Sequence, residues 1–142
     1  FLLTVHAAEG ICIPMNVIQV YKCLCDELRL RILNLLQDGP LCVCHLVEIL
    51  DCDQVKMSKQ LRYMKELGMV EGERQAQWMV YRLADPEHPL LADNLKCLQD
   101  IAAGELSFRE DLEKRAAVME HLRSEPSGCS EALLSEQGRC CR

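Results

Sequence analysis

Two cysteines separated by a single residue, Cys42 and Cys44, are the side chains of this sequence best suited to chemistry. Thiolate sulfur binds soft cations and arsenite well, and a thiol must lose its proton before it does so. Both cysteines fall at the start of a predicted helix, about Cys42 to Leu50, whose dipole and free N–H groups favour an anion. The pattern predicts a thiolate site for a soft ion; the alternative is two half-buried packing residues.

A second group of polar side chains lies on the next predicted helix, Gln54–Leu67. Its apolar residues recur at helical spacing and are expected to face the core: Met57, Leu61, Met64 and Leu67. In a major groove, Gln and Arg can make bidentate base contacts, whereas Lys suits phosphate. DNA contacts are therefore expected from Gln54, Lys56, Ser58, Lys59, Gln60 and Arg62, and from Arg74, Gln75 and Gln77 of the segment that follows.

The overall charge argues against a nucleic-acid partner, but its distribution argues for one. The formal net charge is −6, while most affinity for DNA comes from Lys and Arg neutralising phosphates. Residues 54–83, however, contain six basic and three acidic side chains, so the rest of the chain is strongly acidic. A positive island on an acidic body is typical of a protein that approaches a polyanion with one face.

The ten cysteines could form a disulfide framework or a set of intracellular thiols. Three cysteine pairs are too close in sequence to join distant elements: Cys23 with Cys25, Cys42 with Cys44, and Cys140 with Cys141. No basic region precedes the first apolar run, and no run approaches the roughly 20 apolar residues of a membrane span. A reducing cytoplasm is the expected compartment.

Helical segments alternate with clear breaks in the first half of the chain. A helix is expected from Asn16, and a second one begins after the N-cap Asp26 and is apolar on nearly every side, as expected for the centre of a core. Gly39 and Pro40 end it. A further break at 51–53, with Asp53 as N-cap, leaves two helices joined by three or four residues, which predicts a helix-turn-helix.

Beyond Gly68 the apolar period changes from 3.6 to 2 over residues 70–74 and 78–83, which predicts a β-hairpin "wing" connected by residues 75–77. Two more helices follow, one from about Leu90 and one over 107–124, with Asp111 and Arg115 placed to pair within the latter. The predicted fold class is mainly α with a β-hairpin wing, a winged helix-turn-helix homodimer. Its expected parts are an N-terminal arm (1–15), the winged DNA-binding and dimerisation domain (16–104), a C-terminal helix (105–124) and a flexible cysteine-containing tail (125–142).

Four strings carry a family resemblance, and they read YKCLCDELRLRILNLL, GPLCVCHLVEIL, QVKMSKQLRYMKELGMV and WMVYRLAD. Together they resemble the ArsR/SmtB family of metal- and metalloid-responsive repressors over about Asn16 to Ile101. The resemblance implies a homodimer that binds double-stranded operator DNA without a cofactor and leaves it when an inducer binds. It places Cys42 and Cys44 on positions used by arsenic, antimony, cadmium and lead sensors, and it implies arsenite or antimonite as inducer.

The sequence departs from the family pattern at several positions. Val47 stands where the arsenic-sensing pattern has a third cysteine, His45 where an acidic residue is usual, and Gln60 where the recognition helix usually has His. Cys12, on the arm, is the first choice for a third thiolate, followed by Cys129, Cys140 and Cys141. Packing is expected for Cys23, Cys25, Cys52 and Cys97, and His45 is expected to be an exposed bystander. The residues near the family's second metal site have a different spacing, so no zinc site is predicted there.

The spacing of Cys42 and Cys44 suggests a release mechanism. Residues i and i+2 of an ideal helix point about 200° apart, since each residue turns about 100°. One ion can then bind both thiolates only if the first turn of the helix that begins near Cys42 shifts. That helix is expected to pack behind the recognition helix, Gln54–Leu67, so the shift would move it relative to the DNA-reading surface. Alternatives on the same fold are a cadmium- or lead-responsive repressor and a thiol-redox sensor. An enzyme is not expected, because a thiol oxidoreductase would need C-x-x-C spacing and a strand-helix context.

Overall fold

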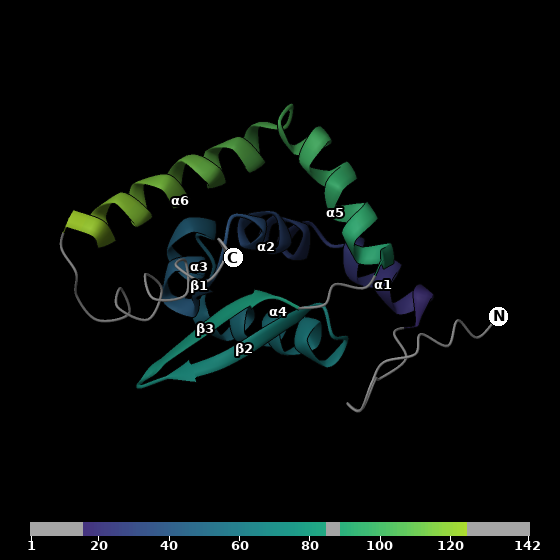
Figure 1. Ribbon diagram of the computed structural model, residues 1–142, viewed down its shortest axis with the longest axis horizontal. Helices are drawn as coiled ribbons and strands as arrows, with labels where there is room; N and C mark the ends of the chain where they lie inside the picture. Colours follow the sequence, from purple (N-terminus) through teal and green to yellow (C-terminus); the bar gives the residue numbers. More distant parts are fainter. Residues whose placement is uncertain (1–15, 85–88, 125–142) are drawn as a thin grey trace.

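The computed structural model describes residues 16–84 and 89–124. In chain order its elements are α1 (Val17–Leu24), α2 (Glu27–Gln37), β1 (Leu41–Cys42), α3 (Val43–Leu50), α4 (Gln54–Glu66), β2 (Val70–Gln75), β3 (Trp78–Leu83), α5 (Pro89–Ala102) and α6 (Leu106–Ser124). Figure 1 shows α5 and α6 arching over one side of α2, with α4 and the hairpin β2–β3 on the opposite side. The predicted mainly helical fold with a hairpin wing is confirmed.

Helix α2 lies at the centre of the core. The Asp26 carboxylate accepts a hydrogen bond from the Arg29 backbone N–H at 3.0 Å, which confirms the predicted N-cap. Ile32, Leu33 and Leu35 have no exposed surface, and α2 packs against α1, α3, α5, α6 and β3. No helix of residues 16–84 and 89–124 is long and apolar enough to cross a membrane.

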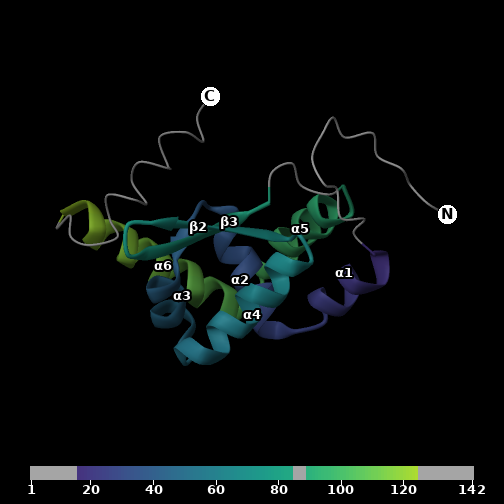
Figure 2. The same cartoon turned by 90° about the horizontal axis from the view of Figure 1, so that it is seen from below.

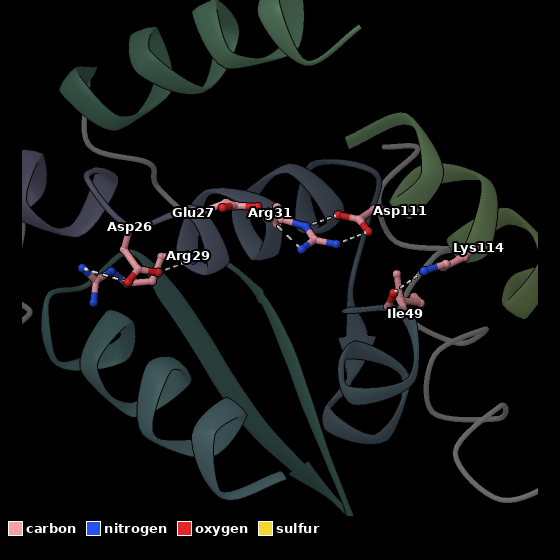
Figure 3. Close-up of polar contacts among 7 residues, drawn as sticks. All are labelled: Asp26, Glu27, Arg29, Arg31, Ile49, Asp111 and Lys114. Atoms are coloured by element: carbon pink, nitrogen blue, oxygen red, sulfur yellow. Dashed lines mark hydrogen bonds and ion pairs between the residues drawn. The ribbon is translucent and has the colours of Figure 1, made fainter. Parts of the chain in front are cut away.

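Helix α6 packs against α2 and α3 and adds Met119 and Leu122 to the core. The expected pair between Asp111 and Arg115 is wrong. The Asp111 carboxylate instead accepts two hydrogen bonds of 2.7 Å from the Arg31 guanidinium, as Figure 3 shows. Arg115 Nη2 donates to the backbone oxygen of Asp38 at 2.9 Å. Both side chains are buried, so partners on and after α2 replace the weak pair within one helix turn.

The wing contains one strand more than expected. Strands β2 and β3 are antiparallel with Gln75 opposite Trp78, so the connection has two residues, and its first, Ala76, has a positive φ of 53°. The short strand β1 pairs with the other edge of β3, with Cys42 opposite Val80, and the sheet order is β1-β3-β2. The sequence predicts a helix from about Cys42, so the strand conformation of Cys42 differs from that prediction, and two residues are too few to show the alternation of a strand.

Candidate nucleic-acid interface and thiol site

The turn between α3 and α4 follows the predicted break. Asp51 has a left-handed conformation, with φ of 47°, and the next N–H, that of Cys52, donates to the Val47 carbonyl at 3.2 Å. The Asp53 carboxylate then accepts from the Lys56 N–H at 2.9 Å and begins α4, as predicted. The two helices therefore pack against each other across a three-residue turn, which is the arrangement of a helix-turn-helix.

Helix α4 has one buried face and one exposed polar face. Met57, Leu61 and Met64 have no exposed surface, which confirms the predicted core stripe at these three positions, and the fourth, Leu67, is half-buried against the core. Six polar residues predicted to contact DNA lie on this helix: Gln54, Lys56, Lys59 and Arg62 are exposed, whereas Ser58 and Gln60 are half-buried. Figure 1 shows α4 on the same side of α2 as the hairpin. The helix thus presents a row of cationic and amide side chains away from the core.

Gln60 is held by a residue of α2. Its carbonyl oxygen accepts a hydrogen bond of 3.1 Å from Arg29 Nη1, and the same guanidinium lies 4.9 Å from the centre of the Tyr63 ring. This contact joins positions 31 residues apart in sequence, so no local sequence pattern predicts it. Arg29 of α2 therefore orients the Gln60 side chain, whereas Lys56 and Lys59 are exposed.

The hairpin carries the remaining residues predicted to contact DNA. Arg74 and Gln77 are exposed near its tip, where Arg74 Nε donates to the Ala76 carbonyl at 3.2 Å, and Gln75 is half-buried. The Tyr81 ring packs closely on Gly72 in the middle of the hairpin, because a Cβ on Gly72 would lie 2.8 Å from that ring. The hairpin can therefore present Arg74 and Gln77 in a defined position beside α4.

One exposed residue of α4 was missed in the sequence. Val55 is 65% exposed on the first turn, where recognition helices contact base edges. Its exposure could have been predicted, because Val55 lies outside the buried stripe that contains Met57 and Leu61. An apolar side chain there can contact the methyl group of thymine, which no other base presents in the major groove.

The thiol site differs from the predicted geometry. Cys42 is not in the helix: it belongs to β1, has extended backbone angles and is the N-cap residue of α3. It is only 2% exposed, whereas Cys44, in the first turn of α3, is exposed. The premise of two cysteines on an ideal helix is therefore wrong. The two thiols nevertheless lie in different environments, one in the core and one at the surface.

Cys42 connects the candidate thiol site to both parts of the DNA interface. Through β1 it pairs with Val80 of β3, the second strand of the wing. Directly after it begins α3, which packs against α4. A displacement of this junction would therefore reach the wing directly through β3 and helix α4 through α3.

The remaining described cysteines divide into two groups. Cys23 is fully buried, and burial raises the pKa of its thiol to about 11, so packing is confirmed for this residue. Cys52 is half-buried beside the core. Cys25 and Cys97 are exposed, so the expectation that they pack is wrong for these two. A surface position at a helix end or on the outer face of α5 needs no apolar partner.

His45 was expected to be exposed, and this is wrong. Its side chain is 7% exposed, and burial lowers its pKa, against the opposing effect of the Glu48 charge. Packing of α6 on α3 covers it: His45 lines a groove of about 390 Å³ between these helices, together with Lys114 and His121 of α6. The sequence contained no indication that α6 would return to this place.

Several predicted ligands lie outside the described residues, namely Cys12, Cys129, Cys140 and Cys141. Within residues 16–84 and 89–124, no three side chains of His, Cys, Asp or Glu form a group that could hold a metal ion. The structure therefore shows the two central cysteines, Cys42 and Cys44, and does not test the third thiolate.

An exposed polar recognition helix, a three-residue turn and a hairpin beside it define a winged helix-turn-helix. The arsR family of bacterial regulatory proteins matches residues 26–72. The arsenical resistance operon repressor of Escherichia coli is 37% identical over 120 residues, which cover 83% of this chain and 95% of that protein. The chain therefore belongs to the arsR family of transcriptional regulators.

Other relatives match shorter stretches. An arsenic resistance transcriptional regulator of Pseudomonas putida is 41% identical over 75 residues, 52% of this chain and 58% of that protein. A cadmium resistance regulatory protein homologue of Staphylococcus aureus is 36% identical over 76 residues, 53% of this chain and 62% of that protein.

Among solved structures, HlyU from Vibrio cholerae has a TM-score of 0.54 at 26% identity, covering 59% of this chain and 88% of that one. A homodimeric winged helix-turn-helix domain from Mycobacterium bovis has a TM-score of 0.52 at 29% identity, covering 63% of this chain and 81% of that one.

Proposed function

We propose that two copies of this chain bind operator DNA as a repressor and leave it when arsenite or antimonite binds cysteine thiolates. The observation that carries the proposal is the junction at Cys42, where the candidate thiol site meets both the wing strand β3 and helix α3. An ion bound at this junction would act on the wing through β3 and on α4 through α3. DNA binding itself requires no cofactor in this proposal.

DNA binding rests on the exposed face of α4. Lys56, Lys59 and Arg62 supply positive charge, and Arg74 and Gln77 extend the surface along the hairpin. Phosphate contacts position such a protein, while base contacts from the first turns of the helix specify the sequence. In a symmetric dimer the two copies of α4 would read a palindromic operator, with half-sites separated by about one helical turn or a multiple of it.

Dimerisation is supported by apolar side chains left at the surface. Val17, Ile18 and Tyr21 of α1 are 51%, 63% and 48% exposed, and Ile101 of α5 is 64% exposed. Figures 1 and 2 both place α1 beside α5. An apolar surface on adjacent terminal helices suits a twofold interface, in which the same residues face each other. Ile18→Glu should yield monomers in analytical ultracentrifugation; an unchanged dimer would exclude α1 from the interface.

Inducer binding must rearrange the start of α3. Cys42 is buried and Cys44 is exposed, so a single ion that holds both thiolates favours a conformation in which the Cys42 sulfur becomes accessible. Such a ligand shifts the equilibrium only by its difference in affinity between the two conformations. The third thiolate is proposed to come from Cys12, or otherwise from Cys129, Cys140 or Cys141.

The test is a titration of the purified, reduced protein on a duplex that it has itself selected from a random-sequence pool. Arsenite should release the DNA, measured as fluorescence anisotropy, and Cys42→Ser or Cys44→Ser should abolish release while retaining DNA binding. Cys97→Ser is the matched control, because Cys97 is an exposed cysteine on α5. A normal response of both Cys42→Ser and Cys44→Ser would place the sensing site elsewhere.

A cadmium-responsive repressor is the second candidate, since a cadmium resistance regulator is among the relatives. The same titration separates the two: release by Cd²⁺ at concentrations where arsenite has no effect would favour cadmium. Release by peroxide without any metal, with no response to arsenite, would instead favour a thiol-redox sensor.

A further inference from the structure

The side chain of Arg29 connects helix α2, to which it belongs, with two other helices, α1 and α4. It belongs to α2, and its side chain is 17% exposed. Its Nε donates to the Cys23 carbonyl at 2.8 Å, and its Nη2 donates to the Lys22 carbonyl at 3.1 Å. Both acceptors lie in the last turn of α1, where helix carbonyls have no partner within the helix. Arg29 therefore closes the end of α1.

The third nitrogen of the same guanidinium holds the recognition helix. Nη1 donates to Gln60 Oε1 at 3.1 Å, and the guanidinium stacks on Tyr63, 4.9 Å from its ring centre. Asp26 balances the charge, with Oδ2 4.0 Å from Nη2, and Figure 3 shows these two side chains adjacent. Each nitrogen thus has its own acceptor, in an arrangement that the one ammonium group of a lysine cannot reproduce.

The contact determines which end of the Gln60 amide faces Arg29. An arginine only donates hydrogen bonds, so the amide oxygen must point toward it. The amide nitrogen, which only donates, is then turned away from α2. A glutamine with both ends available can contact adenine with one donor and one acceptor. In Gln60 the Arg29 contact engages one lone pair of the amide oxygen, and the amide nitrogen is the end directed away from Arg29.

We propose that Arg29 is a positioning residue for DNA reading: it orients Gln60 so that its amide nitrogen donates to a base acceptor in the major groove. The acceptors there are O6 and N7 of guanine, N7 of adenine and O4 of thymine. Arg29 itself does not contact DNA in this proposal. The inference rests on the proposed function, since it assumes that α4 enters the major groove.

The test compares binding-site profiles, selected from random-sequence duplexes, for the wild type, Gln60→Ala and Arg29→Lys. One base pair in each half-site should be preferred about fivefold by the wild type, which corresponds to one hydrogen bond of about 1 kcal/mol. Gln60→Ala should abolish this preference, and Arg29→Lys should at least halve it at the same base pair and at no other. An unchanged profile for Arg29→Lys would overturn the proposal.

Arg31→Lys is the matched control, because Arg31 lies on the same helix but contacts Asp111 of α6. It should leave the profile unchanged. If Arg29→Lys and Arg31→Lys alter the profile alike, Arg29 acts through the stability of α2 and not through Gln60. Salt dependence gives a second readout: the slope of log K against log salt should remain that of the wild type in Arg29→Lys, since no phosphate contact is lost.

Gln60→Glu tests the donor role of Gln60 independently, in case Arg29→Lys does not fold. A glutamate retains an acceptor for Arg29 but replaces the outward donor with a second acceptor. The profile should therefore switch to a base that donates, which is cytosine or adenine through its amino group. Retention of the wild-type preference would refute the donor role of Gln60.

The outcomes also separate this inference from the proposed function. If the wild type selects no DNA sequence, the proposed function fails. If it selects a site, and Lys59→Ala weakens binding and lowers the salt slope while the Arg29 and Gln60 variants retain the wild-type profile, only the inference about Arg29 fails.

Discussion

Loss of the Asp111 carboxylate should be the most destabilising single change among the polar contacts of α6. Arg31 Nε and Nη2 donate to its two oxygens, both at 2.7 Å, and these bonds tie α6 to α2 (Figure 3). The Asp111 side chain is 1% exposed and that of Arg31 is 21% exposed. Paired charge-assisted bonds of this length are among the stronger hydrogen bonds in proteins.

The magnitude follows from the burial of the two partners. Removing one partner of a buried ion pair costs about 3–5 kcal/mol, because the other charge remains buried and unpaired. Arg31 retains some contact with water, and Glu27 lies 3.9 Å from it, so part of that cost is recovered. We therefore expect Asp111→Ala to lower the free energy of unfolding by about 2–4 kcal/mol.

Urea unfolding followed by fluorescence of Trp78, the one tryptophan of the chain, measures this loss at a fixed protein concentration, which keeps dimerisation constant. Glu27→Ala is the control, because Glu27 is 75% exposed and should change the free energy of unfolding by less than about 0.5 kcal/mol. A loss below about 0.5 kcal/mol in Asp111→Ala, or an equal loss in both variants, would refute the reasoning.

Three further predictions concern the DNA interface, the thiols and the wing. Lys59→Ala should weaken operator binding and reduce the salt slope by about 1, as for one lost phosphate contact, and an unchanged slope in anisotropy titrations would contradict that assignment. Cys44 should react with iodoacetamide in the native protein well before Cys42, since only Cys44 is exposed; mass spectrometry of digests measures the order, and equal rates would show that β1 opens freely. Gly72→Ala should lower the free energy of unfolding, measured in urea, by about 1–3 kcal/mol, because the new Cβ would lie 2.8 Å from the Tyr81 ring. In a Tyr81→Leu background most of that loss should disappear. An equal loss in that background would mean that the ring is not the cause.

Local features of the fold could be predicted because they depend on neighbours in sequence. Asp26 and Asp53 cap their helices as predicted, since an N-cap aspartate bonds to an N–H three residues further on. The stripe of Met57, Leu61 and Met64 follows from the helical period alone. The fold class and the family could therefore be predicted from the sequence.

Features that depend on distant segments could not be predicted. Two residues of β1 carry no period, and only pairing with β3 makes Cys42 a buried strand residue. His45 is covered because α6 returns to α3, and Asp111 bonds to Arg31 at a separation of 80 residues. No spacing rule reaches across such distances.

The sequence by itself determined which chemistry is possible here: two closely spaced thiols, a basic recognition helix and the order of elements that joins them. Periodicity and capping depend on residues within one or two helical turns of each other, so they can be recognised in the local sequence alone. Only the tertiary structure decided that Cys42 is buried and Cys44 exposed, and that Arg29 donates a hydrogen bond to the Gln60 amide oxygen. Burial and side-chain orientation depend on which distant elements pack together, and that packing exists only in the folded chain.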